Sequence, residues 1–158
     1  MQFKRYVGAS GTDVLTLLRA LRSAADRYRA FTEGAATRDG ALSRLNLFVY
    51  SMSTLDSEIT KPLLICLGEP EQASLDTTEC DHLLDTLESW FVRRALVRAQ
   101  SQGTNRFMLD LLIHLTKRTA TTGVDDAART FLAAETSSFG YWPDDAVRAR
   151  DDLPGRGS

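Results

Sequence analysis

Residues 83–112 read LLDTLESWFVRRALVRAQSQGTNRFMLDLL and contain two amphipathic helical patterns. Apolar side chains recur three and four positions apart before Gly103, and the same spacing resumes after it. Gly103 is typical of a helix stop, and Thr104 or Asn105 can cap the helix that follows. The stretch therefore predicts two helices joined by a turn at Gly103.

Arg94 projects from the middle of the apolar face of the first helix, because successive residues are rotated by about 100°. Arg98 continues the same line, whereas Arg93 points about a quarter-turn away toward the polar border. No acid lies three or four positions from Arg94 or Arg98, so neither has an ion pair on its own helix. A buried guanidinium without a partner is costly, so we expect the fold to supply a carboxylate, carbonyls or a bound anion.

Two hypotheses follow for Arg94 and Arg98. In the structural hypothesis they form a tertiary salt bridge, with their stems packed beside Trp90. In the functional hypothesis one of them contacts a phosphate or a partner domain. The carboxylates that could complete the salt bridge are those of Asp56, Glu58 and Asp110.

Positive charge is in excess over residues 88–106, where four arginines face a single acid, Glu88. The start of the second helix adds backbone amides and the positive end of the helix dipole, which both favour an anion. We interpret Glu88 and Arg94 as a structural polar core. The candidate contacts to DNA, another anion or a partner are Arg93, Arg98, Thr104, Asn105 and Arg106.

Helical spacing also recurs along the rest of the chain, and no segment shows the alternation of a strand. The third helix is expected to have Asp56, Ser57 and Glu58 in its first turn, with Pro62 early in it or at a kink. The sequence thus predicts an all-α, bundle-like single domain of six or seven helices over residues 1–150, followed by a disordered tail over 151–158. The expected helices cover 12–33, 40–52, 56–67, 76–97, 104–115 and 124–132, and a further one starts at 142–145.

The composition is that of one ordinary globular domain, with 158 residues and a net charge of -2. Cys66 and Cys80 lack the spacing of a zinc site, so we interpret both as small buried side chains in a reducing compartment. The sequence has neither a signal peptide nor an apolar run of membrane length. We therefore expect a cytoplasmic protein with no membrane contact.

Catalytic signatures are missing from the sequence, which has no phosphate-binding glycine loop, GxSxG or HExxH motif. His114 follows Asp110 by four positions, which is a weak metal signal, and a surface or packing role is the expectation for it. His82, near a helix start, is expected at the surface. We accordingly predict no metal, no cofactor and no catalytic residue.

The stretch 83–112 resembles the helical region of the GmrSD-like family of bacterial restriction and antiphage defence proteins. The segments DVLTLLRALRSAADRYRAF, PLLICL and FGYWPDDA resemble the flanking elements of that family, so the resemblance spans most of the chain. The central motif is matched at Leu84, Leu87, Glu88, Ser89, Arg93, Arg94, Thr104 and Asn105.

The resemblance implies a helical middle region between a nucleotide-dependent ParB-like nuclease domain and an HNH nuclease domain that cuts DNA. The chain departs from the whole family protein, because it has neither a DGQQR-like motif nor an HNH histidine constellation. It is therefore expected to be the helical region or a truncated relative, without catalytic activity of its own.

Two functions are open at this point. The first is a non-catalytic scaffold of a modification-dependent restriction or antiphage defence nuclease, in contact with duplex DNA or the neighbouring nuclease domains. The second is a stand-alone helical protein-interaction module with no nucleic-acid role, in which the arginines are held in internal salt bridges.

Overall fold

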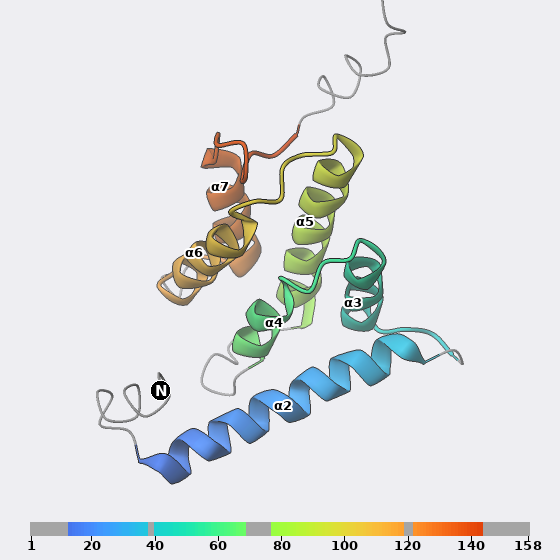
Figure 1. The fold of residues 1–158 in the computed structure, drawn as a ribbon, viewed down its shortest axis with the longest axis vertical. Helices are drawn as coiled ribbons and strands as arrows, with labels where there is room; N and C mark the ends of the chain where they lie inside the picture. Colours follow the sequence, from blue (N-terminus) through green and yellow to red (C-terminus); the bar gives the residue numbers. More distant parts are fainter. Residues whose placement is uncertain (1–12, 38–39, 69–76, 119–121, 144–158) are drawn as a thin grey trace, which may run out of the picture.

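A computed structural model describes residues 13–37, 40–68, 77–118 and 122–143 (Figure 1). No strand occurs in these residues, which confirms the predicted all-α fold. The described helices are α2 (Val14–Ala36), α3 (Arg44–Thr54), α4 (Lys61–Leu67), α5 (Thr77–Leu96), α6 (Thr104–Thr116) and α7 (Val124–Ala134).

Helix α5 stands at the centre of the molecule, packed between α3 and α7 (Figure 1). Helix α2 lies across one end of the bundle, against α3 and the short helix α4. Helix α6 packs on α7 and touches α4. Among consecutive helices, α2 packs on α3 and α6 packs on α7, whereas the other main contacts join helices that are not neighbours in the chain.

The core forms where the apolar faces of α3 to α7 meet, because each of these helices has a stripe that must be kept from water. Trp90 lies at its centre, fully buried, with its ring edge-on to Phe91 (4.8 Å between centroids) and stacked on Phe107 (5.5 Å). The helical spacing read from residues 83–112 thus gives the correct buried face of both α5 and α6. The other core residues include Phe48, Met52, Leu63, Leu87, Leu111, Leu115, Val124 and Leu132.

Helix α4 begins at Lys61, so the prediction that residues 56–58 form its first turn is wrong. Asp56 has a φ of 53° and ends α3 instead: its amide donates to the Ser53 carbonyl (3.1 Å), and the Ser57 amide donates to that of Met52 (2.9 Å). This pair of bonds is the Schellman arrangement that satisfies the last carbonyls of a helix. Pro62 lies in the first turn of α4, one of the two positions expected for it.

Helix α5 ends at Leu96, one residue before the expected end, and a loop separates it from Gly103. Arg98 has a φ of 50°, and its amide donates to the Ala95 carbonyl (3.1 Å) while the Ala99 amide donates to that of Arg94 (2.9 Å). This is a second Schellman arrangement with a residue other than glycine in the left-handed position. The prediction that Arg98 continues the line of Arg94 along one helix is therefore wrong.

The remaining boundaries are close to those expected. Asp13 is the N-cap of α2, which continues past Gly34 to Ala36. Gly103, with a φ of 90°, directly precedes α6, so Thr104 is the first helical residue and not the cap. Trp142 and Pro143 are not helical, and the rest of the helix start expected at 142–145 lies outside the described residues. The Asp76 cap and the tail 151–158 lie outside them too.

Candidate functional site

The guanidinium of Arg94 is buried, with 6% of the residue exposed, and it binds backbone carbonyls. Its Nη1 donates to the Tyr141 carbonyl (3.0 Å), and its Nη2 donates to those of Gln100 (2.6 Å) and Ser138 (3.3 Å). The charge also lies over the rings of Trp90 (4.8 Å) and Tyr141 (5.2 Å). Burial lowers the pKa of Arg94 from its ordinary value, and the guanidinium nevertheless stays charged at any physiological pH.

The expected carboxylate partner of Arg94 is therefore wrong. Asp110 pairs with Arg106 on the same helix, and Glu58 pairs with Lys61. Asp56 ends α3, as described above. Carbonyls can replace a carboxylate because three of them supply acceptors to the guanidinium, without a second buried charge that would need desolvation.

The carbonyls that bind Arg94 come from the loop after α5 and from the segment 135–143 after α7. Trp90 holds the same segment, since its Nε1 donates to the Gly140 carbonyl (3.1 Å). The segment passes close to the core at Gly140, where an added Cβ would lie 2.3 Å from the Glu135 side chain and 3.0 Å from the Phe107 ring. Arg94 and Trp90 thus join the end of the described chain to the central helix.

Glu135 shapes this segment from its first residue. Its carboxylate accepts the Ser137 backbone amide (2.7 Å), and this hydrogen bond holds the pKa of Glu135 below its ordinary value. The turn that results presents the carbonyls of Ser138, Gly140 and Tyr141 to α5. No part of the sequence pattern of residues 83–112 indicates this arrangement.

The other candidate contacts are dispersed. Arg93 is partly buried and donates to the Pro143 carbonyl (3.4 Å), so it joins Arg94 on the segment 135–143. Arg98 is exposed in the turn that ends α5. Arg106 is exposed and pairs with Asp110 (3.2 Å).

The start of α6 does not form an open anion site with these arginines. Thr104 is buried, and its hydroxyl has no hydrogen-bond partner among the described residues. Asn105 is exposed and lines a groove on the surface between α4 and α6. The four arginines of residues 88–106 therefore do not form one basic patch. Arg93 and Arg94 bind the segment 135–143, Arg98 lies in the turn after α5, and Arg106 pairs with Asp110.

Glu88 is partly buried and belongs to an ion-pair network with Arg44 and Asp85, not with Arg94. Arg44, at the start of α3, donates to Asp85 through Nε (2.7 Å) and to Glu88 through Nη2 (2.5 Å), so it joins α3 to α5. Burial alone would lower the pKa of Arg44, but the hydrogen bonds and charges of the two carboxylates raise it. The only sequence signal is the spacing of Asp85 and Glu88, which places both on one face of α5.

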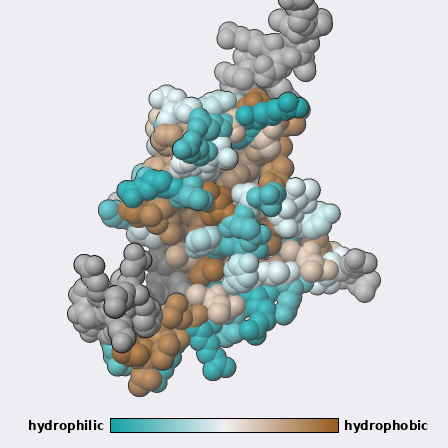
Figure 2. All heavy atoms as spheres, in the orientation of Figure 1, coloured by the Kyte–Doolittle hydropathy of each residue, from teal (hydrophilic) through white to brown (hydrophobic). Residues whose placement is uncertain are grey.

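Helix α2 carries an apolar surface that the fold leaves uncovered. None of its 23 residues is buried, although its spacing is that of an amphipathic helix. Phe31 and Ala35, near its end, pack against the core, and the Lys61 ammonium lies over the Tyr28 ring (4.8 Å). The preceding residues remain exposed on the N-terminal end of α2, where Figure 2 shows hydrophobic side chains together; we name these the α2 stripe: Val14, Leu15, Leu18 and Leu21.

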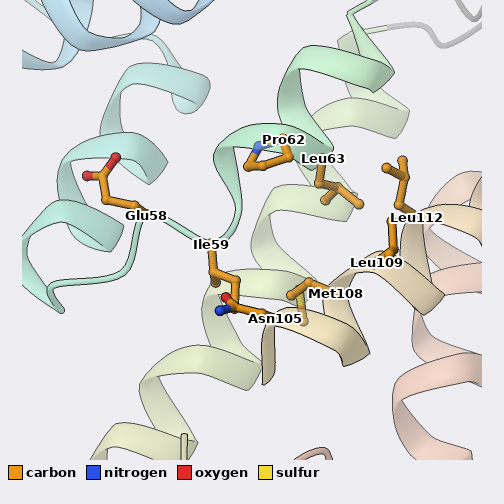
Figure 3. A pocket seen from close by; sticks show the side chains of 8 residues that line it. All are labelled: Glu58, Ile59, Pro62, Leu63, Asn105, Met108, Leu109 and Leu112. Atoms are coloured by element: carbon orange, nitrogen blue, oxygen red, sulfur yellow. The ribbon is translucent and has the colours of Figure 1, made fainter. Parts of the chain in front are cut away.

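A groove with a volume of about 420 Å³ separates α4 from α6 (Figure 3). Pro62 and Leu63 form its α4 side, and Met108, Leu109 and Leu112 form its α6 side. Glu58 and Asn105 are the polar side chains at its border. The groove therefore offers mainly apolar contact.

The described residues contain neither a group of side chains suited to a metal ion nor a helix suited to span a membrane. None of their His, Cys, Asp and Glu side chains forms a group of three or more that could hold a metal ion. His114 and His82 are exposed as expected, and the His114 ring packs beside Phe131 (5.2 Å). The two cysteines form no disulfide, and none of the described helices is both long and apolar enough to cross a bilayer.

Comparison with known protein families, with curated proteins and with solved structures found no match to this chain. The resemblance of residues 83–112 to the GmrSD-like family therefore stays a prediction.

Proposed function

We propose that this chain is a non-catalytic helical docking domain that binds another protein through the α2 stripe. The observation that carries the proposal is the exposure of the four residues of the α2 stripe on a helix whose end projects beyond the bundle. Exposed apolar surface of this kind marks interaction sites, because water contact with it is unfavourable until a partner covers it.

The charge of α2 indicates what kind of partner surface would be complementary to it. The helix contains four arginines, at positions 19, 22, 27 and 29, against two acids, Asp26 and Glu33. Arg22 and Arg29 each approach Asp26 only to 3.9 Å and are largely exposed, so these pairs leave the side of α2 positively charged. We expect a partner with an apolar contact face and acidic residues at its edge.

The GmrSD-like resemblance gives this partner a proposed identity, namely the nuclease domains of the parent protein, in the cytoplasm. In the alternative proposal the chain is a stand-alone interaction module whose partner has no nucleic-acid role. Arg93 and Arg94 donate hydrogen bonds to carbonyls of their own chain. In both forms of the proposal the partner therefore contacts the α2 stripe and not these two arginines.

Site-specific photo-crosslinking in the native host tests the proposal. A benzophenone amino acid is placed at Leu18, on the stripe, and in a control at Leu96, at the end of α5; the two leucines are 51% and 54% exposed. We expect a reproducible adduct to one protein from position 18 and none to that protein from position 96. No adduct at position 18, or the same adducts from both positions, would overturn the proposal.

The identity of the adduct separates the two forms of the proposal. A polypeptide with a ParB-like or HNH nuclease domain supports the defence-nuclease scaffold. A partner without such a domain supports the stand-alone module.

Contact with duplex DNA is a second proposal, which rests on Arg106. Its side chain is 76% exposed and lies in the first turn of α6, near the positive end of that helix dipole. Fluorescence anisotropy of a labelled duplex at low salt tests it, with Arg106→Ala and, as a matched control, Arg129→Ala on α7. Saturable, salt-dependent binding that only Arg106→Ala weakens supports the proposal, and absence of binding contradicts it.

A further inference from the structure

The exposed apolar residues of α2 follow the seven-residue repeat of a coiled coil. Alternate steps of four and three residues lead from Val14 through Leu18, Leu21 and Ala25 to Tyr28. We name the four exposed residues at the start of this repeat the α2 seam: Val14, Leu18, Leu21 and Ala25. A repeat of this kind keeps one narrow face in line along the helix, so the surface that fits it is a second helix with a matching repeat.

The chain's own bundle limits the direction of that second helix. The repeat continues to Tyr28 and Ala35, but the Tyr28 ring lies 4.8 Å from the Lys61 ammonium, and Ala35 packs against the core. A parallel partner helix would follow the repeat toward these residues and meet α3 and α4, which pack on α2 there. An antiparallel copy of α2 instead begins opposite Ala25 and leaves past Val14, where the helix end projects beyond the bundle (Figure 1).

The α2 seam is complementary to itself in the antiparallel direction. When Leu18 of one copy faces Leu21 of the other, Val14 faces Ala25, so the larger side chain of this layer meets a smaller one. A hollow in the surface beside Ala25 and Tyr28 leaves room for the Val14 side chain of the second copy. Each contact occurs twice, because a two-fold symmetric dimer uses the same patch on both copies.

The charges of α2 permit this pairing, although the helix as a whole is positive. The positions that flank the α2 seam are Leu15, Leu17, Arg22 and Ala24, so Arg22 is the only charge among them. In the antiparallel register Arg22 faces Leu15 of the second copy and not another arginine. Two copies therefore bring no like charges together at the border of the contact.

We propose that two copies of this chain pair through the α2 seam as an antiparallel, two-fold symmetric dimer. The proposal rests on the exposed surface that the proposed function uses, and it names a second copy as the occupant of that surface when no docking partner is bound. The contact covers residues 14–25 of each copy and is about 18 Å long, which is short for a protein interface. We therefore expect a weak dimer, with a Kd of about 10–100 µM.

Sedimentation velocity of the purified full chain, from about 5 to about 500 µM, tests the pairing. We expect a reversible monomer–dimer equilibrium in the wild type. Leu18→Glu places charges in the two central layers and should weaken the Kd about 100-fold or more. Leu109→Glu on α6 is the control and should dimerise like the wild type, since Leu18 and Leu109 are 51% and 46% exposed.

A wild type that stays monomeric at about 500 µM, or a dimer that Leu18→Glu does not weaken, would overturn the proposal. Neither result bears on the docking of another protein, because photo-crosslinking in the host tests that contact separately. Loss of the dimer in Leu109→Glu alone would place the contact on α6 and would likewise overturn pairing through α2.

Two substitutions of Leu15 test the antiparallel direction. Leu15→Glu places a carboxylate opposite Arg22 of the second copy at two symmetric positions, whereas Leu15→Lys places like charges there. We expect Leu15→Glu to dimerise about tenfold more tightly than Leu15→Lys at low salt, and the difference should shrink at about 0.5 M salt. Equal Kd values at low salt would overturn the antiparallel pairing, because Leu15 faces no residue of the partner's α2 in a parallel dimer.

Discussion

Arg94 shows how a charged residue can belong to a hydrophobic core. The sequence predicted its position correctly, because helical periodicity alone places it among Leu87, Trp90 and Phe91. Carbonyls were one of the three kinds of partner expected for it, but the sequence could not select them, since they belong to residues up to 47 positions away that lie in no helix. Backbone acceptors leave no trace in a sequence, whereas carboxylates do.

Replacement of Arg94 tests this structural role. Arg94→Met keeps the contact of the stem with Trp90 but leaves three inward carbonyls without a donor. We expect a loss of about 2–5 kcal/mol in the free energy of unfolding, measured in urea. Arg106→Met is the control and should change it by about 0.5 kcal/mol or less, because its ion pair is exposed. Similar values for the two variants would contradict a core role for Arg94.

Glu135 predicts a pH dependence of the segment that Arg94 holds. The pKa of Glu135 is lowered in the folded state, so its contribution to stability is complete above the ordinary glutamate pKa and is lost as the pH falls through the lowered one. The wild type should therefore exceed Glu135→Gln in free energy of unfolding at neutral pH, and the difference should shrink toward pH 3. Glu33→Gln, on the exposed side of α2, is the control. A difference between wild type and Glu135→Gln that is constant with pH would refute the role of the carboxylate.

At the scale of the elements, helix existence and type follow from the sequence, whereas the turns that close two of the helices do not. The left-handed turns at Asp56 and Arg98, which close α3 and α5, were not predicted because the residue at this position is usually a glycine. Gly103, the glycine that was expected to end α5, instead precedes α6. The shorter α5 matters for the site, since the loop after it supplies the Gln100 carbonyl to Arg94.

Arg98→Gly tests the helix end directly. A side chain at a φ of 50° is strained, and glycine removes that strain, so we expect this variant to gain about 0.5–1 kcal/mol in free energy of unfolding. Ala95→Gly, inside the last turn of α5, should instead lose about 1 kcal/mol. A gain in the free energy of unfolding for Arg98→Gly and a loss for Ala95→Gly would show that the helix ends before Arg98. A loss in both variants would contradict this helix end.

At the scale of the whole molecule, the bundle buries one face of each helix from α3 to α7, whereas α2 only packs its C-terminal end against the core without burying any residue. Sequence periodicity could not distinguish these cases, because an amphipathic stripe indicates that a face will be covered and not by which chain. For the same reason, the proposed contact surface lies on α2 and not on residues 88–106, where the sequence analysis expected it. The arginine-rich stretch 88–106, which the sequence favoured, turns inward at Arg93 and Arg94, while α2 presents the apolar surface that docking requires.

The free energy of unfolding of Leu21→Ala, compared with that of Leu87→Ala, tests the docking account most directly. Leu87 is fully buried at the centre of α5, and its truncation should cost about 2–5 kcal/mol. Leu21 lies half exposed on the α2 stripe, so Leu21→Ala should remain within about 0.5 kcal/mol of the wild type. A loss of about 2 kcal/mol or more in Leu21→Ala would show that the stripe is covered by this chain itself, and would contradict its assignment as a surface for another protein.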